Sequence, residues 1–249
     1  MGALEGTGAI VTGSSRGIGA DVATLLAAEG ASVVVNYRQK APRATKVVAA
    51  IEAAGGRAVA VGADLTTDEG PRALVEAAIT NFGSLGLLVL NASGGMESGV
   101  EADYALKLNR DAQVAMLKAA ADVMPAGSRV VFVTSHQAHF INTVPTMEAY
   151  EPVARSKRAG EDALRELIPE LEAKGITLVV VSGDMIEGTV TATLLDRAAP
   201  GAIEARRKEA GKLYSVAEFA AEIVGMASAE VASGHTEYVG GAGHFQSQA

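Results

Sequence analysis

The chain has 249 residues, of which 49% are hydrophobic, and it carries a formal net charge of −8 and no cysteine. One large α/β core is therefore expected, a nucleic-acid or anionic-membrane partner is not, and disulfides, thiolate catalysis and cysteine-based zinc sites are excluded. The first residues lack a basic region followed by an apolar stretch, and no apolar run approaches the length of a membrane span. We expect a cytoplasmic protein with no membrane partner.

Short β-prone runs alternate with longer runs of helical period along the whole chain. We predict strands at residues 8–12, 32–36, 58–62, 87–91, 129–134, 177–182 and 236–239, and helices at residues 18–29, 42–54, 68–82, 103–124 and 152–174. This alternation is typical of a parallel sheet with helices on both faces. The prediction is one α/β domain, residues 1–249, built on a Rossmann-type doubly wound parallel sheet of about seven strands.

Several predicted helix ends carry residues that suit them. A glycine stands where each of four helices should stop, since glycine adopts left-handed backbone geometry at little cost; these are Gly30, Gly55, Gly83 and Gly175. Two segments, residues 66–69 and 215–218, fit the capping box that opens a helix.

A glycine-rich turn joins the first predicted strand to the first predicted helix. Its glycines let the backbone pass close to a pyrophosphate, and the helix N-terminus offers N–H groups to an anion. The candidate cofactor-binding residues of this turn are Gly13, Ser15, Arg16, Gly17, Ile18 and Gly19. A plain tight turn is the alternative interpretation.

Six further motifs follow in chain order: Ala63-Asp64-Leu65, Asn91-Ala92-Ser93-Gly94, Leu108-Asn109, Thr134-Ser135, Ser156-Lys157 and Tyr238-Val239-Gly240-Gly241. Together with the glycine turn they resemble the short-chain dehydrogenase/reductase family over essentially the whole chain. Within that family the pattern is most similar to bacterial 3-oxoacyl-acyl-carrier-protein reductases. The resemblance implies cofactor contacts from the first two motifs, through Ala63, Asp64, Leu65, Asn91, Ala92 and Ser93.

The end of the second predicted strand bears on which cofactor is used. A carboxylate there would bind the ribose hydroxyl of NAD and repel the extra phosphate of NADP. This chain instead has Asn36, followed by Tyr37 and Arg38, with Arg16 close by in the glycine turn. Because a guanidinium group pairs with phosphate through a planar fork, NADP(H) is predicted in preference to NAD(H). The alternative interpretation is that Arg16 and Arg38 are solvated surface residues with no role in cofactor binding.

The resemblance also implies a reaction, the transfer of a hydride between nicotinamide and a carbonyl or secondary alcohol, with a 3-oxoacyl thioester as one candidate substrate. Its residues would be Ser135 orienting the substrate oxygen, a tyrosine as acid and base, Lys157 on the ribose and the phenolate, and Asn109 in a proton relay. A phenol with a pKa of about 10 needs a nearby cation to act as a base near neutrality.

The tyrosine does not stand at the family's usual place. Val153 occupies the position four residues before Lys157, and the nearest tyrosine is Tyr150. Pro152 suits the first turn of a helix, so Tyr150 is predicted to lie in the loop before it. From that loop the phenol can fold back over the lysine, and Tyr150 is the preferred candidate for the acid and base.

Two alternatives to Tyr150 stay open at this point. His136, His139 or Glu151 could supply the acid and base, or the chain could be a catalytically idle NADP(H)-binding sensor or partner-binding protein on the same fold. A metal site on the two histidines is not expected, because no third ligand is spaced with them.

The charged, helical stretch at residues 183–215 interrupts the alternation of strands and helices. Ligands bind beyond the carboxyl ends of the strands in such sheets, so this stretch is a candidate substrate lid, with a solvated surface excursion as the alternative. The family resemblance implies contacts from Gly183 and Thr189 to the nicotinamide side of the cofactor, although Thr189 equally suits a helix N-cap. Family members commonly pair long helices, so residues 103–124 and 152–174 are the predicted faces of a homodimer or homotetramer.

Overall fold

The computed structural model describes residues 2–96, 99, 101 and 103–248. Its seven strands form one parallel sheet in the order β3-β2-β1-β4-β5-β6-β7. The strands are β1 (Gly8–Val11), β2 (Ser32–Tyr37), β3 (Arg57–Gly62), β4 (Leu87–Leu90), β5 (Arg129–Ser135), β6 (Thr177–Gly183) and β7 (Thr236–Val239). The order reverses between β1 and β4, so the crevice at the carboxyl ends of these two strands is the place where such folds bind ligands. The predicted fold is confirmed.

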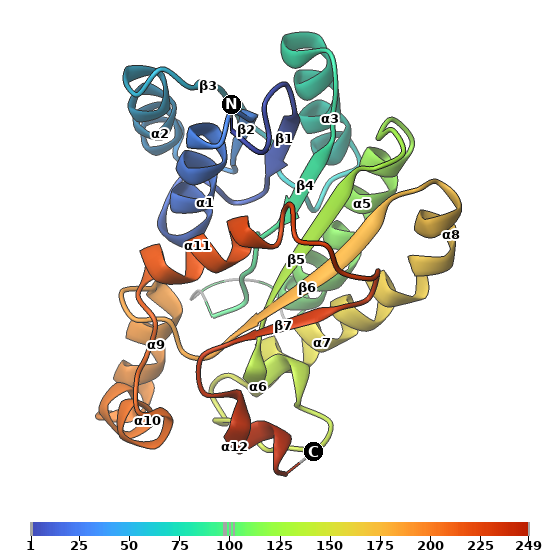
Figure 1. Ribbon diagram of the computed structural model, residues 1–249. Coiled ribbons are helices and arrows are strands. Elements are labelled where there is room, and N and C mark those ends of the chain that lie inside the picture. The colour runs from blue at the N-terminus through green and yellow to red at the C-terminus, as the bar shows by residue number, and fades with distance from the viewer. Residues whose placement is uncertain (1, 97–98, 100, 102, 249) are drawn as a thin grey trace.

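Helices cover both faces of the sheet (Figure 1). One layer contains α1 (Gly17–Ala28), α2 (Ala41–Ala53) and α11 (Val216–Gly225), and the other contains α3 (Glu69–Phe82), α5 (Ala112–Ala121) and α7 (Glu151–Glu166). Neighbouring residues of one strand point to opposite faces. Val11 accordingly packs in the core of the first layer, and Ile10 packs in the core of the second.

The two longest predicted helices are divided. Residues 103–124 form α4 (Tyr104–Leu106), a π-helical turn η1 (Lys107–Asp111) and α5, which ends at Ala121. Residues 152–174 form α7, which starts at Glu151, and α8 (Ile168–Ala173). Pro169 explains the second break, because its nitrogen has no hydrogen to donate to the carbonyl four residues earlier.

The remaining helices gather at the carboxyl end of the sheet (Figure 1). They are α6 (His136–His139), α9 (Val190–Ala198), α10 (Ala202–Ala210) and α12 (Ala242–Gln246). A third, smaller apolar cluster lies here and combines residues from α6, α7, α9 and the loops after α6, β6 and α10: Ala138, Ile141, Tyr150, Val153, Ala154, Met185, Ala192, Leu195 and Leu213.

The helix-end predictions are mostly confirmed. Gly30, Gly55, Gly83 and Gly175 all have positive φ. Ser215 and Glu218 form a complete capping box. The predicted box at residues 66–69 is wrong: the side chain of Asp64 accepts hydrogen bonds from the backbone and hydroxyl of Thr66, and Thr67 Oγ1 accepts from the amide of Gly70 instead. Within the described ranges, no helix is long and apolar enough to cross a membrane.

Candidate active site

The glycine turn after β1 is packed tightly on one side and open on the other. A Cβ on Gly19 would lie 2.6 Å from Asn91 Nδ2, and one on Gly13 would lie 3.0 Å from Ala92 Cα. Gly17 differs: its φ is +56°, and no heavy atom lies within 4 Å of where a Cβ would stand. The backbone at Gly17 therefore faces free space, which is what close approach of a phosphate requires.

The N-terminus of α1 opens from the same turn. Its N-cap residue is Arg16, in extended conformation, and no side chain caps the helix. Arg16 is exposed, and Ser15 and Ile18 are half-buried. An N-terminus without a side-chain cap retains N–H donors and the positive end of the helix dipole for an external anion. These features fit the pyrophosphate of a dinucleotide.

Asn36 holds the turn in place. Its Oδ1 accepts from the amide of Gly13 at 3.0 Å, and its Nδ2 donates to the carbonyl of Ala63 at 3.1 Å. Its own amide donates to Ser14 Oγ at 2.9 Å. The side chain is buried, so its role is to tie the end of β2 to the glycine turn and to the end of β3. No carboxylate is placed at this position.

The other predicted cofactor residues line the same crevice. Arg38 is exposed, Tyr37 is half-buried, and Ala63 and Leu65 are buried beside the half-buried Asp64. After β4, Asn91 Nδ2 donates to the carbonyl of Thr12 at 3.0 Å, and the amide of Ala92 donates to Thr12 Oγ1 at 3.0 Å. Ser93 is exposed. The ends of β1, β2, β3 and β4 thus bring together polar backbone groups and two exposed arginines, Arg16 and Arg38.

Asn109 lies in the π-helical turn and is buried. Its Nδ2 donates to the carbonyl of Gly94 and to Ser156 Oγ, both at 2.9 Å. A Cβ on Gly160 of α7 would lie 2.0 Å from the carbonyl oxygen of Asn109, so only glycine permits this packing. Such π turns occur frequently at functional sites. The sequence pattern named Asn109 but gave no sign of the π turn that presents it.

Ser135 and Tyr150 meet at the carboxyl end of β5. The hydroxyl oxygens Ser135 Oγ and Tyr150 Oη are 3.2 Å apart. Tyr150 is the N-cap residue of α7, outside the helix as Pro152 predicts, and only 4% of it is exposed. Burial raises the pKa of the Tyr150 phenol, and the hydrogen bond with Ser135 opposes that rise without cancelling it. The phenol is therefore protonated at neutral pH.

Lys157 lies on α7, seven residues after Tyr150 in sequence, and the hydrogen-bond partner of the phenol is Ser135. Within the described ranges, no hydrogen bond or ion pair holds the Lys157 ammonium group. Burial lowers the pKa of Lys157 to about 8, while the negative charge of Glu161 acts in the opposite direction. Val153, one turn before Lys157, is buried in the third apolar cluster, and its Cγ2 lies 3.2 Å from where a Cβ on Gly95 would stand. Valine thus fills the place that the family resemblance gives to tyrosine.

The three other acid and base candidates are engaged elsewhere. His136 is fully buried with Nδ1 2.8 Å from Ser182 Oγ, and burial lowers its pKa to about 4. His139 lies between a carboxylate and a phenol, with Nδ1 2.8 Å from Glu161 Oε1 and Nε2 2.9 Å from the hydroxyl of Tyr238. Glu151 pairs with Arg155. The described residues include no cluster of three or more potential metal ligands.

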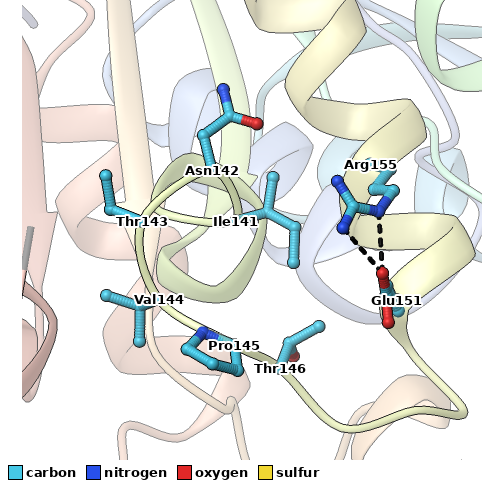
Figure 2. A pocket seen from close by; sticks show the side chains of 8 residues that line it. All are labelled: Ile141, Asn142, Thr143, Val144, Pro145, Thr146, Glu151 and Arg155. Atoms are coloured by element: carbon cyan, nitrogen blue, oxygen red, sulfur yellow. Dashed lines mark hydrogen bonds and ion pairs between the residues drawn. The ribbon is translucent and has the colours of Figure 1, made fainter.

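A cavity of about 240 Å³ lies beside the start of α7 (Figure 2). Figure 2 shows the loop after α6 curling around it, with the Glu151–Arg155 ion pair on its α7 side. The cavity is lined by Ile141, Asn142, Thr143, Val144, Pro145, Thr146, Glu151 and Arg155. Glu151 directly follows Tyr150, so the segment that carries the phenol also forms one wall of this cavity.

The charged stretch of residues 183–215 folds back over the carboxyl end of the sheet. Gly183 ends β6 against the ring of Phe219, 2.6 Å from where a Cβ would stand. Thr189 is the N-cap of α9: its Oγ1 accepts from the amide of Ala192 at 3.1 Å and donates to the carbonyl of Ile186 at 2.8 Å. Capping therefore occupies the Thr189 hydroxyl in this structure.

A buried ion pair, which the sequence pattern did not indicate, holds α10 in place. Arg206 donates to Asp184 through Nε at 2.8 Å and Nη2 at 2.8 Å, and Nη2 also donates to the carbonyl of Gly241 at 3.0 Å. Its guanidinium carbon lies 4.8 Å from the centre of the Phe245 ring. The pair joins α10 to the end of β6 and to the C-terminal segment.

Comparison with known proteins agrees with this geometry. The family model for short chain dehydrogenases matches residues 7–199. A hydroxynaphthalene reductase of Aspergillus fumigatus is 35% identical over 204 residues, covering 80% of this chain and 73% of the relative. A solved short-chain dehydrogenase from Burkholderia cenocepacia in complex with NADP superposes with a TM-score of 0.81 at 30% identity, covering 96% of this chain and 98% of that chain.

A second solved structure, the angucycline C-6 ketoreductase LanV with bound NADP, has a TM-score of 0.79 at 28% identity and covers 96% of each chain. The matched residues span both the glycine turn and the Ser135–Tyr150–Lys157 segment. The chain therefore belongs to the short-chain dehydrogenase/reductase family and is an oxidoreductase acting on CH–OH or C=O groups.

Proposed function

We propose that the protein is an NADPH-dependent ketoreductase whose substrate carries its carbonyl on an apolar body. The observation that carries the proposal is the 3.2 Å separation of Ser135 Oγ and Tyr150 Oη at the carboxyl end of β5. Two hydroxyl groups at this distance can both reach one carbonyl oxygen. Ser135 orients that oxygen, and Tyr150 donates a proton to it.

The protonated state of the phenol supports the reductive direction of the proposal. Burial raises the pKa of Tyr150, so at neutral pH the group is a proton donor rather than a base. A proton donor suits reduction of a ketone, and NADPH supplies the hydride when it is bound. Asn109 donates hydrogen bonds to the carbonyl of Gly94 and to Ser156 Oγ, which holds the π turn against α7. Lys157, the next residue of α7, supplies the ammonium group that would bind the nicotinamide ribose.

The preference for NADPH rests on charge. Arg16 in the glycine turn and Arg38 directly after β2 are both exposed, and the side chain near the end of β2 is the buried amide of Asn36. Positive charge without a competing carboxylate favours a 2′-phosphate. The cofactor would be held by Gly13, Ser15, Arg16, Gly17, Ile18, Gly19, Asn36, Tyr37, Arg38, Ala63, Asp64, Leu65, Asn91, Ala92, Ser93, Lys157, Gly183 and Thr189. Thr189 can serve only if its hydroxyl gives up part of its capping role.

The substrate class follows from what surrounds the phenol. Tyr150 packs in an apolar cluster with Val153 and Met185, and half-buried Met96 and Met147 extend it. Methionine side chains adapt to irregular apolar shapes. Two buried carboxylates, Asp184 and Glu161, are both paired with cationic partners, Asp184 with Arg206 and Glu161 with Arg165. These walls suit a bulky, uncharged ketone, in keeping with relatives named as hydroxynaphthalene and angucycline reductases.

A lid at residues 183–215 is part of this proposal, because Ala192 and Leu195 of α9 complete the apolar cluster over the phenol. Since Tyr150 is only 4% exposed, side chains around it must move for a bulky ketone to reach it, and α9 is the helix that we propose moves. Homo-oligomerisation through α5 and α7 and a cytoplasmic location stay predictions. Light scattering tests the first, with a monomer as the contradicting result.

Turnover of NADPH tests the proposal. The purified protein is mixed with NADPH and a panel containing a tetralone-type bicyclic ketone, a small aliphatic ketone and a 3-oxoacyl thioester, and absorbance of the reduced nicotinamide is followed. We expect the bicyclic ketone to be consumed fastest. Faster turnover of the thioester would place the protein with the 3-oxoacyl reductases that its sequence resembles. Binding of NADPH with no turnover of any ketone would favour the catalytically idle alternative.

A further inference from the structure

An arginine and a tyrosine meet near the carboxyl end of β2. Arg38 Nη1 donates a hydrogen bond to the hydroxyl of Tyr104. The guanidinium carbon also lies 5.3 Å from the centre of the Tyr104 ring. Arg38 directly follows β2, and Tyr104 begins α4, which follows β4. The two side chains are 66 residues apart in sequence.

The position of this contact connects it to the proposed cofactor site. In the sheet, β2 and β4 are the two neighbours of β1, and the glycine turn with Gly17 extends from the end of β1. Arg38 directly follows β2, so its contact with Tyr104 lies at this end of the sheet. It lies on the side of β2, where the adenosine end of a dinucleotide is expected in a doubly wound fold.

The geometry restrains an otherwise free side chain. An exposed arginine samples many rotamers, and ordering it at a ligand costs conformational entropy. The Tyr104 ring restrains the guanidinium plane, and its hydroxyl fixes one nitrogen. Within the described residues, no other hydrogen bond or ion pair holds Arg38, so most of its N–H donors are available to a ligand.

We propose that Tyr104 is a positioning residue for cofactor selection, holding Arg38 so that its remaining N–H groups receive the 2′-phosphate of NADP(H). The inference rests on the proposed preference for NADP(H) and adds a residue to which the family motifs assign no role. An exposed pair adds little to folding stability, so recognition of a ligand is the effect to measure.

Calorimetric titration of the protein without cofactor tests the proposal. Adenosine 2′,5′-bisphosphate and 5′-AMP are the two probes, because they differ only in the 2′-phosphate. We expect wild type to bind the bisphosphate more tightly than AMP. Tyr104→Phe keeps the ring and removes the hydroxyl, and should weaken bisphosphate binding about three- to tenfold while leaving AMP binding unchanged.

A double-mutant cycle shows whether Tyr104 acts through Arg38. Arg38→Gln should abolish most of the discrimination between the probes, and adding Tyr104→Phe to it should then change nothing further. Arg57→Gln is the matched control: Arg57 is another exposed arginine over an aromatic ring, 5.1 Å from the centre of Phe82, but it lies at the amino end of β3. It should leave both affinities unchanged.

Three results would overturn the inference. Tyr104→Phe could discriminate between the two probes as well as wild type does, or it could weaken bisphosphate binding equally in the presence and absence of Arg38. It could also bind the bisphosphate more tightly than wild type, which would make Tyr104 a competitor of the ligand. If wild type itself does not distinguish the two probes, the proposed NADP(H) preference fails as well. Thermal melting of each variant verifies that it is folded.

Discussion

Ser135 Oγ and Tyr150 Oη lie 3.2 Å apart, although the phenol stands seven residues before Lys157 and valine occupies the family's usual tyrosine position. The N-cap position of α7 makes this possible, because Tyr150 lies outside the helix and its side chain turns toward the end of β5. The hydroxyl groups of Ser135 and Tyr150 thus lie within hydrogen-bond distance. Tyr150, however, is farther from Lys157 along the chain than the tyrosine of the family pattern is. Protonation of the phenol is then governed by burial more than by a neighbouring cation.

Gly17→Ala should separate cofactor binding from stability. Its φ of +56° makes alanine strained, at a cost of about 1–2 kcal/mol in the free energy of unfolding. The added methyl group would occupy the open space that a pyrophosphate needs. NADPH binding, measured by fluorescence titration, should therefore weaken by at least about tenfold.

Gly83→Ala provides the matched control. Gly83 has φ +79° and, like Gly17, no heavy atom within 4 Å of the Cβ position, but it ends α3 far along the chain from the turn. Its stability loss should equal that of Gly17→Ala, and its NADPH affinity should be that of wild type. Equal weakening of NADPH binding by both substitutions would show that the effect comes from general destabilisation.

The Asp184–Arg206 pair should behave as a buried ion pair. Removing only the cation with Arg206→Met leaves the Asp184 carboxylate buried, which should lower the free energy of unfolding by about 3–5 kcal/mol. The double variant Asp184→Asn with Arg206→Met should recover much of that loss. Urea unfolding of wild type, Arg206→Met and the double variant gives the three free energies. Arg207→Met is the control, because its partners Glu187 and Glu204 are half-exposed or exposed, and it should cost less than about 1 kcal/mol.

Acid should destabilise the protein through His136. Burial lowers its pKa from 6.5 in the unfolded chain to about 4 in the folded protein, so between these values the unfolded chain binds more protons. Stability is complete above pH 6.5 and is lost as the pH falls toward 4, by about 3 kcal/mol from this group. Urea unfolding of wild type and His136→Asn across this range gives the measurement. If the free energy of unfolding of the two proteins falls equally as the pH is lowered from 6.5 to 4, the assignment to His136 is rejected.

Local patterns account for what the sequence could predict. The strands, the glycine turn and the helix-ending glycines depend on residues close together in the chain, so the pattern places all seven strands to within about two residues at each end. The position of Tyr150 before its helix also follows from a neighbour, Pro152.

Long-range packing accounts for what the sequence could not predict. The π turn at Asn109 depends on the absence of a side chain at Gly160, and nothing near Asn109 in the chain signals it. Arg206 reaches Asp184 across 22 residues, and the charged stretch that contains it reads equally well as a solvated surface. The contact of Arg38 with Tyr104 joins the end of β2 to the start of α4, 66 residues away, and has no local pattern either.

The role of Tyr150 is tested most directly by the turnover number of Tyr150→Phe with the best ketone of the panel. Phenylalanine keeps the packing of the ring and removes the proton, so kcat should fall by about 10²- to 10⁴-fold while the Kd for NADPH stays within about twofold of wild type. A turnover number within about threefold of wild type would contradict the account and direct attention to His136, His139 and Glu151 as the proton donor.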